Sequence, residues 1–325
     1  MKIAIRRFPF SVLSGVALAI AASSSALAQT QQYPNRPIEF IVPFAAGGGT
    51  DVMARAFADA AQKHLPQPMV VMNKPGASGT IGWSYIAGAP PDGYKIAVIT
   101  TELAIVPHLG VTKLTYQDLL PIARLNYDPS AITVKADSPF NTVEEFLDAA
   151  KKKPGAMNIG NAGNGSIWHM AAAALEDKTG TKFGHVPFQG ANPAILALLG
   201  GHVDAVTVSP AEVYPHVSAG KLKTLAVMAD QRVKGFENVP TLKERNIEQA
   251  IGTWRGIAVA KNTSPEVLAV LRPAIAKAAA EPAFREKLDK QNLGFAYADE
   301  ATFKNQIARE NDYFKQMAQK LGLKP

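Results

Sequence analysis

The chain has 325 residues, of which 47% are hydrophobic and 19% are charged; its formal net charge is +7 and it contains no cysteine. The apolar fraction is sufficient for packed cores, so the composition excludes wholesale disorder and collagen-like repeats, and the length fits two domains or one large one. The absence of cysteine excludes a disulfide scaffold, a thiol nucleophile, an iron–sulfur cluster and a zinc site built on thiolates.

Residues 1–28 have the pattern of a secretory signal peptide. Lys2, Arg6 and Arg7 form a basic start, an apolar run follows over residues 8–22, and small residues lead to Ala28 at the positions that a signal peptidase recognises. The apolar run is too short to cross a membrane comfortably. Cleavage after Ala28 removes three of the positive charges and leaves 297 residues with a net charge of +4. We therefore expect an exported, periplasmic protein.

The first part of the mature chain alternates strands with helices. The pattern predicts buried strands over residues 38–42, 69–72 and 96–99. Glycine-rich loops over residues 43–49 and 73–79 follow the first two strands, and each loop leads into a helix. Strands that alternate with helices at this interval predict an α/β architecture with a largely parallel sheet.

A similar unit recurs in the middle of the chain. Thr142 and Glu145 fit a capping box at the start of a helix. A short strand over residues 157–160 leads to a third glycine-rich loop at residues 161–165, and Ser166 opens the next helix. Beyond it, a helix and two strands are expected over residues 194–199, 203–208 and 222–228.

The last part of the chain is predicted to be helical. Ser264 and Pro265 supply an N-cap and a proline at the first helical position. A final amphipathic helix is indicated by the apolar residues Phe303, Ile307, Phe314, Met317 and Leu321. We expect it to pack against the first part of the chain.

The glycine loops do not match a nucleotide site, but they suit an anion. Val52 stands where a dinucleotide fingerprint needs its third glycine, and neither the first loop nor residues 160–166 contain the lysine of a P-loop. Glycine leaves backbone N–H groups accessible, and the first N–H groups of a helix have no partner within the helix. Both kinds of N–H group can donate hydrogen bonds to an anion. A single such loop is most simply a tight turn. Three of them at the carboxyl ends of strands favour a ligand site, because that edge of an α/β sheet binds ligands.

Enzymatic and nucleic-acid functions find little support in the sequence. The six histidines form no HxxxH or HxH pair, and no serine lies in a G-x-S-x-G elbow. Ser166 and His169 are close in sequence, but at a helix start the serine caps and the histidine packs. The basic run at residues 151–153 is too short to follow a phosphate backbone. We expect no catalysis, no metal, no cofactor and no nucleic acid.

A series of motifs runs in order through the whole mature chain. They are Tyr33-Pro34, Arg36-Pro37-Ile38, Val42-Pro43-Phe44-Ala45-Ala46-Gly47-Gly48-Gly49-Thr50-Asp51, Asn73-Lys74-Pro75-Gly76-Ala77-Ser78-Gly79, Ala89-Pro90-Pro91-Asp92-Gly93-Tyr94, Gly163-Asn164-Gly165-Ser166 with His169, Val186-Pro187-Phe188-Gln189-Gly190, Leu199-Gly200-Gly201-His202-Val203-Asp204, Gly220-Lys221-Leu222 and Val239-Pro240-Thr241-Leu242. The series resembles the Bug family, the extracytoplasmic solute receptors of tripartite tricarboxylate transporters.

The resemblance implies a two-lobed α/β fold of the periplasmic-binding-protein type (type II, Venus flytrap), with a hinge and a cleft between the lobes. Residues 29–128 and 253–325 would form lobe 1, and residues 129–252 would form lobe 2. The expected function is capture of a small carboxylated solute and its delivery to integral membrane transporter subunits by a monomeric receptor. The alternatives are a hydrolase or isomerase on the same scaffold, or a ligand sensor for a membrane signalling protein.

The resemblance also implies which residues bind the solute. One ligand carboxylate would lie between a first-lobe loop (Gly48, Gly49, Thr50, Asp51) and a second-lobe loop (Gly163, Gly165, Ser166). Asp204 matches a family position near the cleft, and the further donors would be Ser78 and Thr101.

Three residues lie outside the shared pattern. Glu102 at a strand end is either an acceptor for a ligand amine or hydroxyl, or a solvated loop carboxylate. Arg255 either pairs with a second ligand carboxylate or has a surface or hinge role. Trp168 is expected to pack rather than to form an aromatic platform for the solute.

Overall fold

The computed structural model describes residue 1, residues 33–320 and residue 322. The predicted signal segment, residues 1–28, lies outside the described residues apart from Met1. Across the described part of the chain, no helix is both long and apolar enough to cross a membrane.

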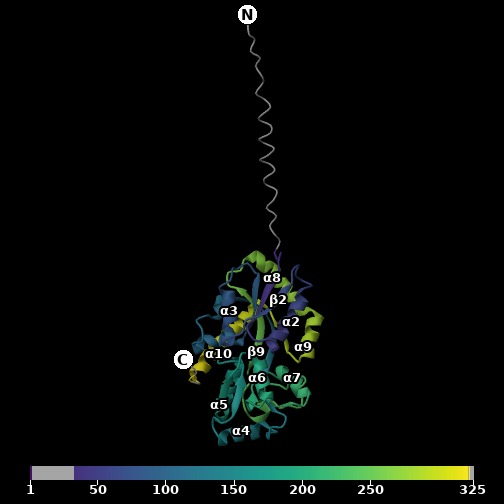
Figure 1. Cartoon of the computed structure of the whole chain (residues 1–325). Helices are drawn as coiled ribbons and strands as arrows, with labels where there is room; N and C mark the ends of the chain where they lie inside the picture. Colours follow the sequence, from purple (N-terminus) through teal and green to yellow (C-terminus); the bar gives the residue numbers. More distant parts are fainter. Residues whose placement is uncertain (2–32, 321, 323–325) are drawn as a thin grey trace.

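The molecule consists of two α/β lobes joined through one mixed sheet (Figure 1). The strand order is β2-β1-β3-β9-β4-β7-β5-β6, and β10 and β8 pair with β4. The strands are β1 (Ile38–Val42), β2 (Met69–Asn73), β3 (Lys95–Thr100), β4 (Leu119–Lys135), β5 (Asn158–Asn161), β6 (Gly184–Pro187), β7 (Ala205–Val206), β8 (Leu222–Met228), β9 (Gly252–Ala260) and β10 (Phe295–Ala298).

Helices cover both lobes. They are α2 (Gly49–Ala61), α3 (Thr80–Ala87), α4 (Val143–Lys152), α5 (Ile167–Thr179), α6 (Ala191–Leu199), α7 (Pro210–Ser218), α8 (Pro265–Ala280), α9 (Pro282–Lys290) and α10 (Glu300–Lys320), with short 3₁₀ helices at Ala77–Gly79, Thr101–Ala104, Val106–Leu109, Tyr116–Asp118 and Lys243–Arg245. We call the part with β1–β3, α2, α3, α8 and α9 the first lobe, which lies above in Figure 1. The part with β5–β8 and α4–α7 is the second lobe, which lies below.

Predicted capping residues open three of these helices, as the sequence pattern indicates. In α4, Thr142 accepts a hydrogen bond from the backbone N–H of Glu145 (3.2 Å), and the Glu145 side chain returns the contact. Ser166 caps α5 and Ser264 caps α8, and each serine side chain accepts from the backbone N–H three residues further on. The structure thus confirms these predicted caps. A cap depends on residues only three positions apart, so a local sequence pattern is enough to predict it.

The long strand β4 is shared by the two lobes. Between Leu119 and Pro129 it pairs with β9, and between Ser130 and Lys135 it pairs with β8. Strand β9, which lies between β3 and β4, brings the chain back to the first lobe. The lobe boundaries at residues 128/129 and 252/253 stay predictions, and this change of partner within β4 supports them.

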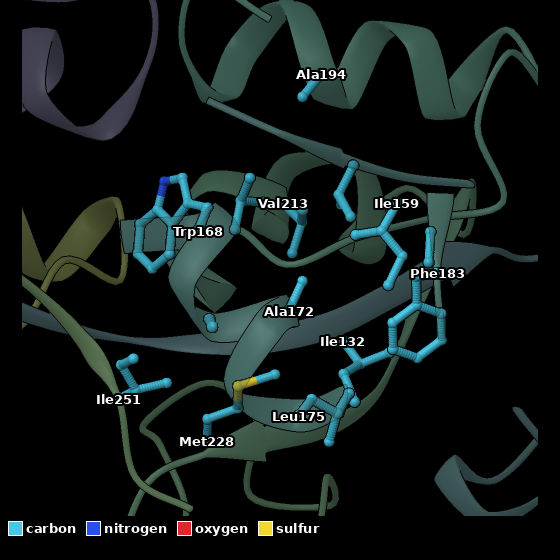
Figure 2. Close-up of a cluster of buried hydrophobic side chains, with 14 of the residues drawn as sticks. Ile132, Ile159, Trp168, Ala172, Leu175, Phe183, Ala194, Val213, Met228 and Ile251 are labelled. Atoms are coloured by element: carbon cyan, nitrogen blue, oxygen red, sulfur yellow. The ribbon is translucent and has the colours of Figure 1, made fainter. Parts of the chain in front are cut away.

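Each lobe has its own hydrophobic core. In the first, Phe57 of α2 packs edge-on against Phe284 of α9, with ring centroids 5.6 Å apart. In the second, Ile159, Leu175 and Phe183 are among the residues of the buried cluster that Figure 2 shows. The two cores hold the elements of each lobe together, so the strand ends between them are fixed in position.

Helix α10 contacts both lobes, whereas the sequence predicts packing on the first part alone. Phe303 and Ile307 are buried in a first-lobe cluster, but Phe314 belongs to the core of the second lobe. Near the end of α10, Lys320 forms an ion pair with Asp177 of α5 (2.6 Å). The helix is therefore a third connection between the lobes, besides β4 and β9.

Candidate functional site

A small cavity of about 20 Å³ lies between the lobes. The first lobe contributes Gly49, Thr50 and Glu102 to its lining, and the second lobe contributes Trp168 and Glu212. Such a volume holds about one water molecule. The cavity therefore lies where the two lobes meet, and it is small.

The first-lobe loop presents the start of α2 to this cavity. Gly48 is the N-cap and offers no side chain, so the first amides of α2 need a partner from elsewhere. The N–H of Gly49 donates to Oε1 of Glu212 (3.1 Å), a residue of the second lobe. The side chain of Thr50 accepts from Nε of Arg255 (3.0 Å). Gly48, Gly49 and Thr50 thus line the cavity, and their part in binding a solute stays a prediction.

Asp51 supports the loop without lining the cavity. Its carboxylate accepts from the N–H of Gly47 (3.0 Å) and from Nδ2 of Asn73 (2.9 Å), and pairs with Arg55 (3.0 Å). Burial acts to raise the pKa of Asp51, but the hydrogen bonds from Arg55, Gly47 and Asn73 outweigh it and hold the pKa below its usual value. Asp51 is therefore an ionised anchor that fixes the loop.

Glu212 reaches the cavity from the first turn of α7. Its Oε2 atom accepts from the backbone N–H (3.1 Å) and the hydroxyl (3.0 Å) of Ser209, which caps this helix. The other oxygen extends across to Gly49 and lies 3.5 Å from Nη2 of Arg255. Burial raises the pKa of Glu212, and the charge of Arg255 opposes this rise.

Glu102 makes the corresponding contact from the first lobe to a helix start of the second lobe. It lies in the 3₁₀ helix after β3, and its Oε1 atom accepts from the N–H of Ile167 (2.9 Å), the first residue of α5 in the second lobe. Thr100 donates its hydroxyl to the other oxygen. Burial raises the pKa of Glu102, against the hydrogen bonds from Thr100 and Ile167. The expectation of a solvated loop carboxylate is wrong, because only 3% of the residue is exposed.

Arg255 on β9 is buried and fully engaged with the protein itself. Its Nη1 atom contacts the carboxylate of Asp128 and the side-chain oxygen of Asn126 (2.6 Å), both on β4. Together with Thr50 and Glu212, these partners join the crossing strands to both lobes. Arg255 lines the cavity, but the surface role considered from the sequence is excluded by its 1% exposure.

The second-lobe loop lies behind the cavity wall. Ala162 and Trp168 line the cavity, whereas Gly163, Gly165 and Ser166 do not belong to its lining. Both glycines have positive φ angles, +121° at Gly163 and +78° at Gly165, which side chains rarely adopt. They shape the turn that leads into α5.

Ser166 and His169 form a helix cap, not a catalytic pair. The hydroxyl of Ser166 accepts from the backbone N–H of His169 (3.2 Å), and Nδ1 of His169 accepts from the N–H of Gly165 (3.1 Å). Nδ1 of His169 already accepts this backbone N–H, so it is not available to take a proton from the Ser166 hydroxyl. Within the residues that the structure describes, no group of three or more His, Asp or Glu side chains could hold a metal ion.

Two of the further donors expected from the resemblance have structural partners. The hydroxyl of Ser78 donates to the carbonyl oxygen of Asn164 (2.5 Å), which joins the second first-lobe loop directly to the second lobe. The Thr101 hydroxyl accepts from the N–H of Trp254 (2.9 Å) and so holds β9. Its neighbour Thr100 lines the cavity instead.

Asp204 lies away from the cavity. It is exposed, and its carboxylate accepts from the N–H of Asn158 (2.8 Å) at the start of β5. The cavity lies beyond the opposite end of this strand, next to Ala162. Asp204 therefore stabilises the beginning of the strand pair β5–β7, and we remove it from the site.

Trp168 combines packing with a place at the site. It is 3% exposed and belongs to the second-lobe core, at one side of the cluster in Figure 2, and it also lines the cavity. Close by, Asn161 is fully buried, and its Nδ2 atom has no hydrogen-bond partner among the described residues. That amide is a neutral donor that the sequence motifs do not single out.

Comparison with known proteins agrees with this geometry. A family model described as TctC, tripartite tricarboxylate transporter family receptor, matches residues 53–323. The chain belongs to this receptor family. Two relatives of the receptor are a UPF0065 protein from the gbd 5′ region of Cupriavidus necator, 34% identical over 98% of both chains, and BugT of Bordetella pertussis, 30% identical over 81% of this chain and 79% of BugT.

Solved structures show the same fold for this receptor. The periplasmic binding protein BugD is 29% identical and superposes with a TM-score of 0.85 over 90% of this chain and 99% of BugD. MatC from Rhodopseudomonas palustris with bound malate is 26% identical, with a TM-score of 0.81 over 88% of this chain and 99% of MatC. A TctC solute-binding protein from Polaromonas is 60% identical and has a TM-score of 0.67 over 89% and 99% of the two chains. The chain thus has the two-lobed fold of the periplasmic binding proteins and is a solute-binding receptor of the TctC/Bug type.

Proposed function

We propose that this receptor works in the periplasm, captures a small carboxylated solute between its lobes and delivers it to the membrane subunits of a tripartite transporter. The observation that carries the proposal is the interlobe cavity at the start of α2, lined by Gly48, Gly49 and Thr50. Backbone N–H groups at a helix start bind carboxylates without a charged side chain. The malate bound to MatC is a carboxylate of this kind.

Capture requires the lobes to move. A cavity of about 20 Å³ cannot contain a solute of several heavy atoms, so the lobes must separate to admit it and then close around it. The Polaromonas structure supports such movement. A chain 60% identical shares its local structure, so a TM-score below that of the less similar BugD is best explained by a different relative position of the lobes.

The contacts across the cleft mark the arrangement in which the lobes are close together. The hydrogen bond from Ser78 to Asn164 and the contact of Gly49 with Glu212 join loops of different lobes, so they form only when the lobes are close. The closed surface that results is the one a membrane subunit would recognise. We therefore assign transporter recognition to the closed form.

Thermal unfolding in the presence of candidate solutes tests the proposal. A solute at one hundred times its dissociation constant adds about 2.7 kcal/mol to the free energy of unfolding, which raises the melting temperature of a chain this long by about 5 °C. We expect such a shift with one or more mono-, di- or tricarboxylates, and with none of a control set of neutral sugars and divalent metals. Stabilisation by sugars or metals but by no carboxylate would refute the proposal.

Two further measurements address delivery and chemistry. Full-length protein produced with its leader is expected to have Gln29 as its first residue after export, and to retain transporter subunits from solubilised membranes only when its solute is present. Mass spectrometry of the solute after long incubation is expected to find it unchanged. Turnover of the solute would indicate an enzyme on this scaffold.

A further inference from the structure

Each lobe places a carboxylate at the helix start of the other lobe. Glu102 of the first lobe accepts from Ile167 at the start of α5, and Glu212 of the second lobe accepts from Gly49 at the start of α2. Both residues line the cavity. The two positions that suit a ligand carboxylate best are therefore already flanked by negative side chains of the protein.

The cavity lining has fewer basic side chains than carboxyl groups. Arg255 is the only basic residue in the lining, as far as the described residues go, and it is held by Asp128 and Glu212. Glu102 has no cationic partner within hydrogen-bond distance; its contacts are with Thr100 and Ile167. Two carboxyl groups, those of Glu102 and Glu212, thus line the cavity together with one guanidinium that Asp128 and Glu212 already engage.

The hydrogen bonds show that both glutamates act as acceptors. The two oxygens of Glu102 receive Ile167 N–H and Thr100 O–H. Those of Glu212 receive Gly49 N–H on one side and the N–H and hydroxyl of Ser209 on the other. An atom that already accepts a hydrogen can accept another from a ligand through its second lone pair, but it offers no hydrogen to a ligand carboxylate.

We propose that this cleft selects carboxylated solutes whose far end carries a hydrogen-bond donor, an ammonium group above all, and disfavours those with a second carboxylate, with Glu102 and Glu212 as the selecting residues. This inference rests on the proposed carboxylate-receptor function. One carboxylate of the solute can use neutral donors at the cleft, such as the backbone N–H groups at the start of α2. The unpartnered amide of Asn161 belongs to the residue directly before Ala162, which lines the cavity. A second carboxylate would face acceptor oxygens that offer it no hydrogen, whereas an ammonium group would donate to them.

Matched pairs of solutes test the selection directly. Each pair has one carbon skeleton and differs at one end: succinate with 4-aminobutanoate, glutarate with 5-aminopentanoate, and terephthalate with 4-(aminomethyl)benzoate. Calorimetric titration of the mature receptor is expected to give dissociation constants at least about tenfold lower for the amino compound of each pair that binds. Equal or tighter binding of the dicarboxylates overturns the inference and leaves the receptor function standing. Binding of no carboxylate at all is the separate failure of the proposed function.

Charge-neutral variants identify the residues responsible. In Glu102→Gln and Glu212→Gln the shape and one acceptor oxygen are kept, and glutamine remains compatible with the capping box of α7. Each is expected to reduce the preference for the amino compound by at least about threefold. Glu286→Gln, an exposed change on α9, is the matched control and should leave the preference as in the wild type. A preference unaltered in both cleft variants would overturn the assignment of Glu102 and Glu212 as the selecting residues. The comparison of solute pairs on the wild-type receptor remains a valid test even if one variant does not fold.

Discussion

Gly49 lies where the two lobes approach each other closely at the site. A Cβ atom there would lie 2.8 Å from Nη2 of Arg255 and 3.1 Å from Oε1 of Glu212. At Gly48, next in the chain, the nearest atom would be 3.9 Å away, which is ordinary contact. There is therefore room for an added Cβ atom at Gly48 but not at Gly49.

Gly49→Ala is expected to weaken solute binding at least about tenfold, because the added methyl group obstructs closure at a cost of 1–3 kcal/mol, roughly, as overpacking does. Gly48→Ala is the control and is expected to bind within about twofold of the wild type. Titration of both variants with the same solute decides the matter. Similar affinities for the two would show that closure does not bring these atoms together.

His169 makes the stability of the receptor depend on pH. It packs edge-on against His185, with ring centroids 4.8 Å apart, and burial together with this neighbour lowers the pKa of His169 from 6.5 to about 4. The folded state therefore resists protonation more than the unfolded state. The free energy of unfolding is therefore highest, as far as His169 is concerned, above the unfolded-state pKa of 6.5. It decreases as the pH falls from 6.5 towards 4, by up to about 3 kcal/mol.

Replacement of His169 by Asn removes this titration and keeps an acceptor for the N–H of Gly165. Denaturant unfolding at about pH 7.5 and about pH 4.5 should show a smaller loss of stability in the variant than in the wild type. His202→Asn changes an exposed histidine and serves as the control. Equal losses in all three proteins would rule out His169 as the source.

At the scale of elements, the start of α5 combines a structural and a binding role. Ser166→Ala removes the cap of a helix whose first N–H meets Glu102, so it should lower the free energy of unfolding by about 1 kcal/mol and also weaken solute binding. Thr142→Ala removes the cap of α4, away from the cavity, and should reduce stability by a similar amount without changing affinity. Loss of affinity in both variants would mean that binding responds to stability alone.

The elements that the sequence predicts well are those whose signals are local. Strands β1 and β8, and the capped starts of α4, α5 and α8, follow from patterns within a few residues. Strands β4 and β9 are not predicted as strands. In β4, Pro121, Asn126 and Pro129 interrupt the apolar pattern, and pairing with a distant strand decides the conformation instead.

Some residues of the candidate site have local sequence signals and others do not. Glycine at residues 48 and 49 marks the first-lobe loop from the sequence alone, because a helix whose N-cap has no side chain needs another partner for its first N–H groups. Glu212 is missed, although the capping box that begins at Ser209 is visible in the sequence. Its contact with Gly49 joins residues far apart in the chain, and no local pattern carries that information.

For the whole molecule, helix α10 is one of three connections between the lobes in the part of the chain that the structure describes, besides β4 and β9. Phe314 is 3% exposed in the core of the second lobe, whereas the adjacent Tyr313 is 51% exposed. Phe314→Ala is expected to lower the free energy of unfolding by about 3–5 kcal/mol, and Tyr313→Ala by less than about 1 kcal/mol. Denaturant unfolding measures both. A small effect of Phe314→Ala would show that the second half of α10 contributes little to holding the lobes together.

The place of β9 in the sheet sets an order of events during synthesis. This strand lies between β3 and β4, so the sheet of the first lobe lacks an inner strand until residues 252–260 have left the ribosome. Strands β5 to β8 and the part of β4 that pairs with them all lie between Ser130 and Met228, so they need no later strand. The sheet of the part that is translated first is thus completed last.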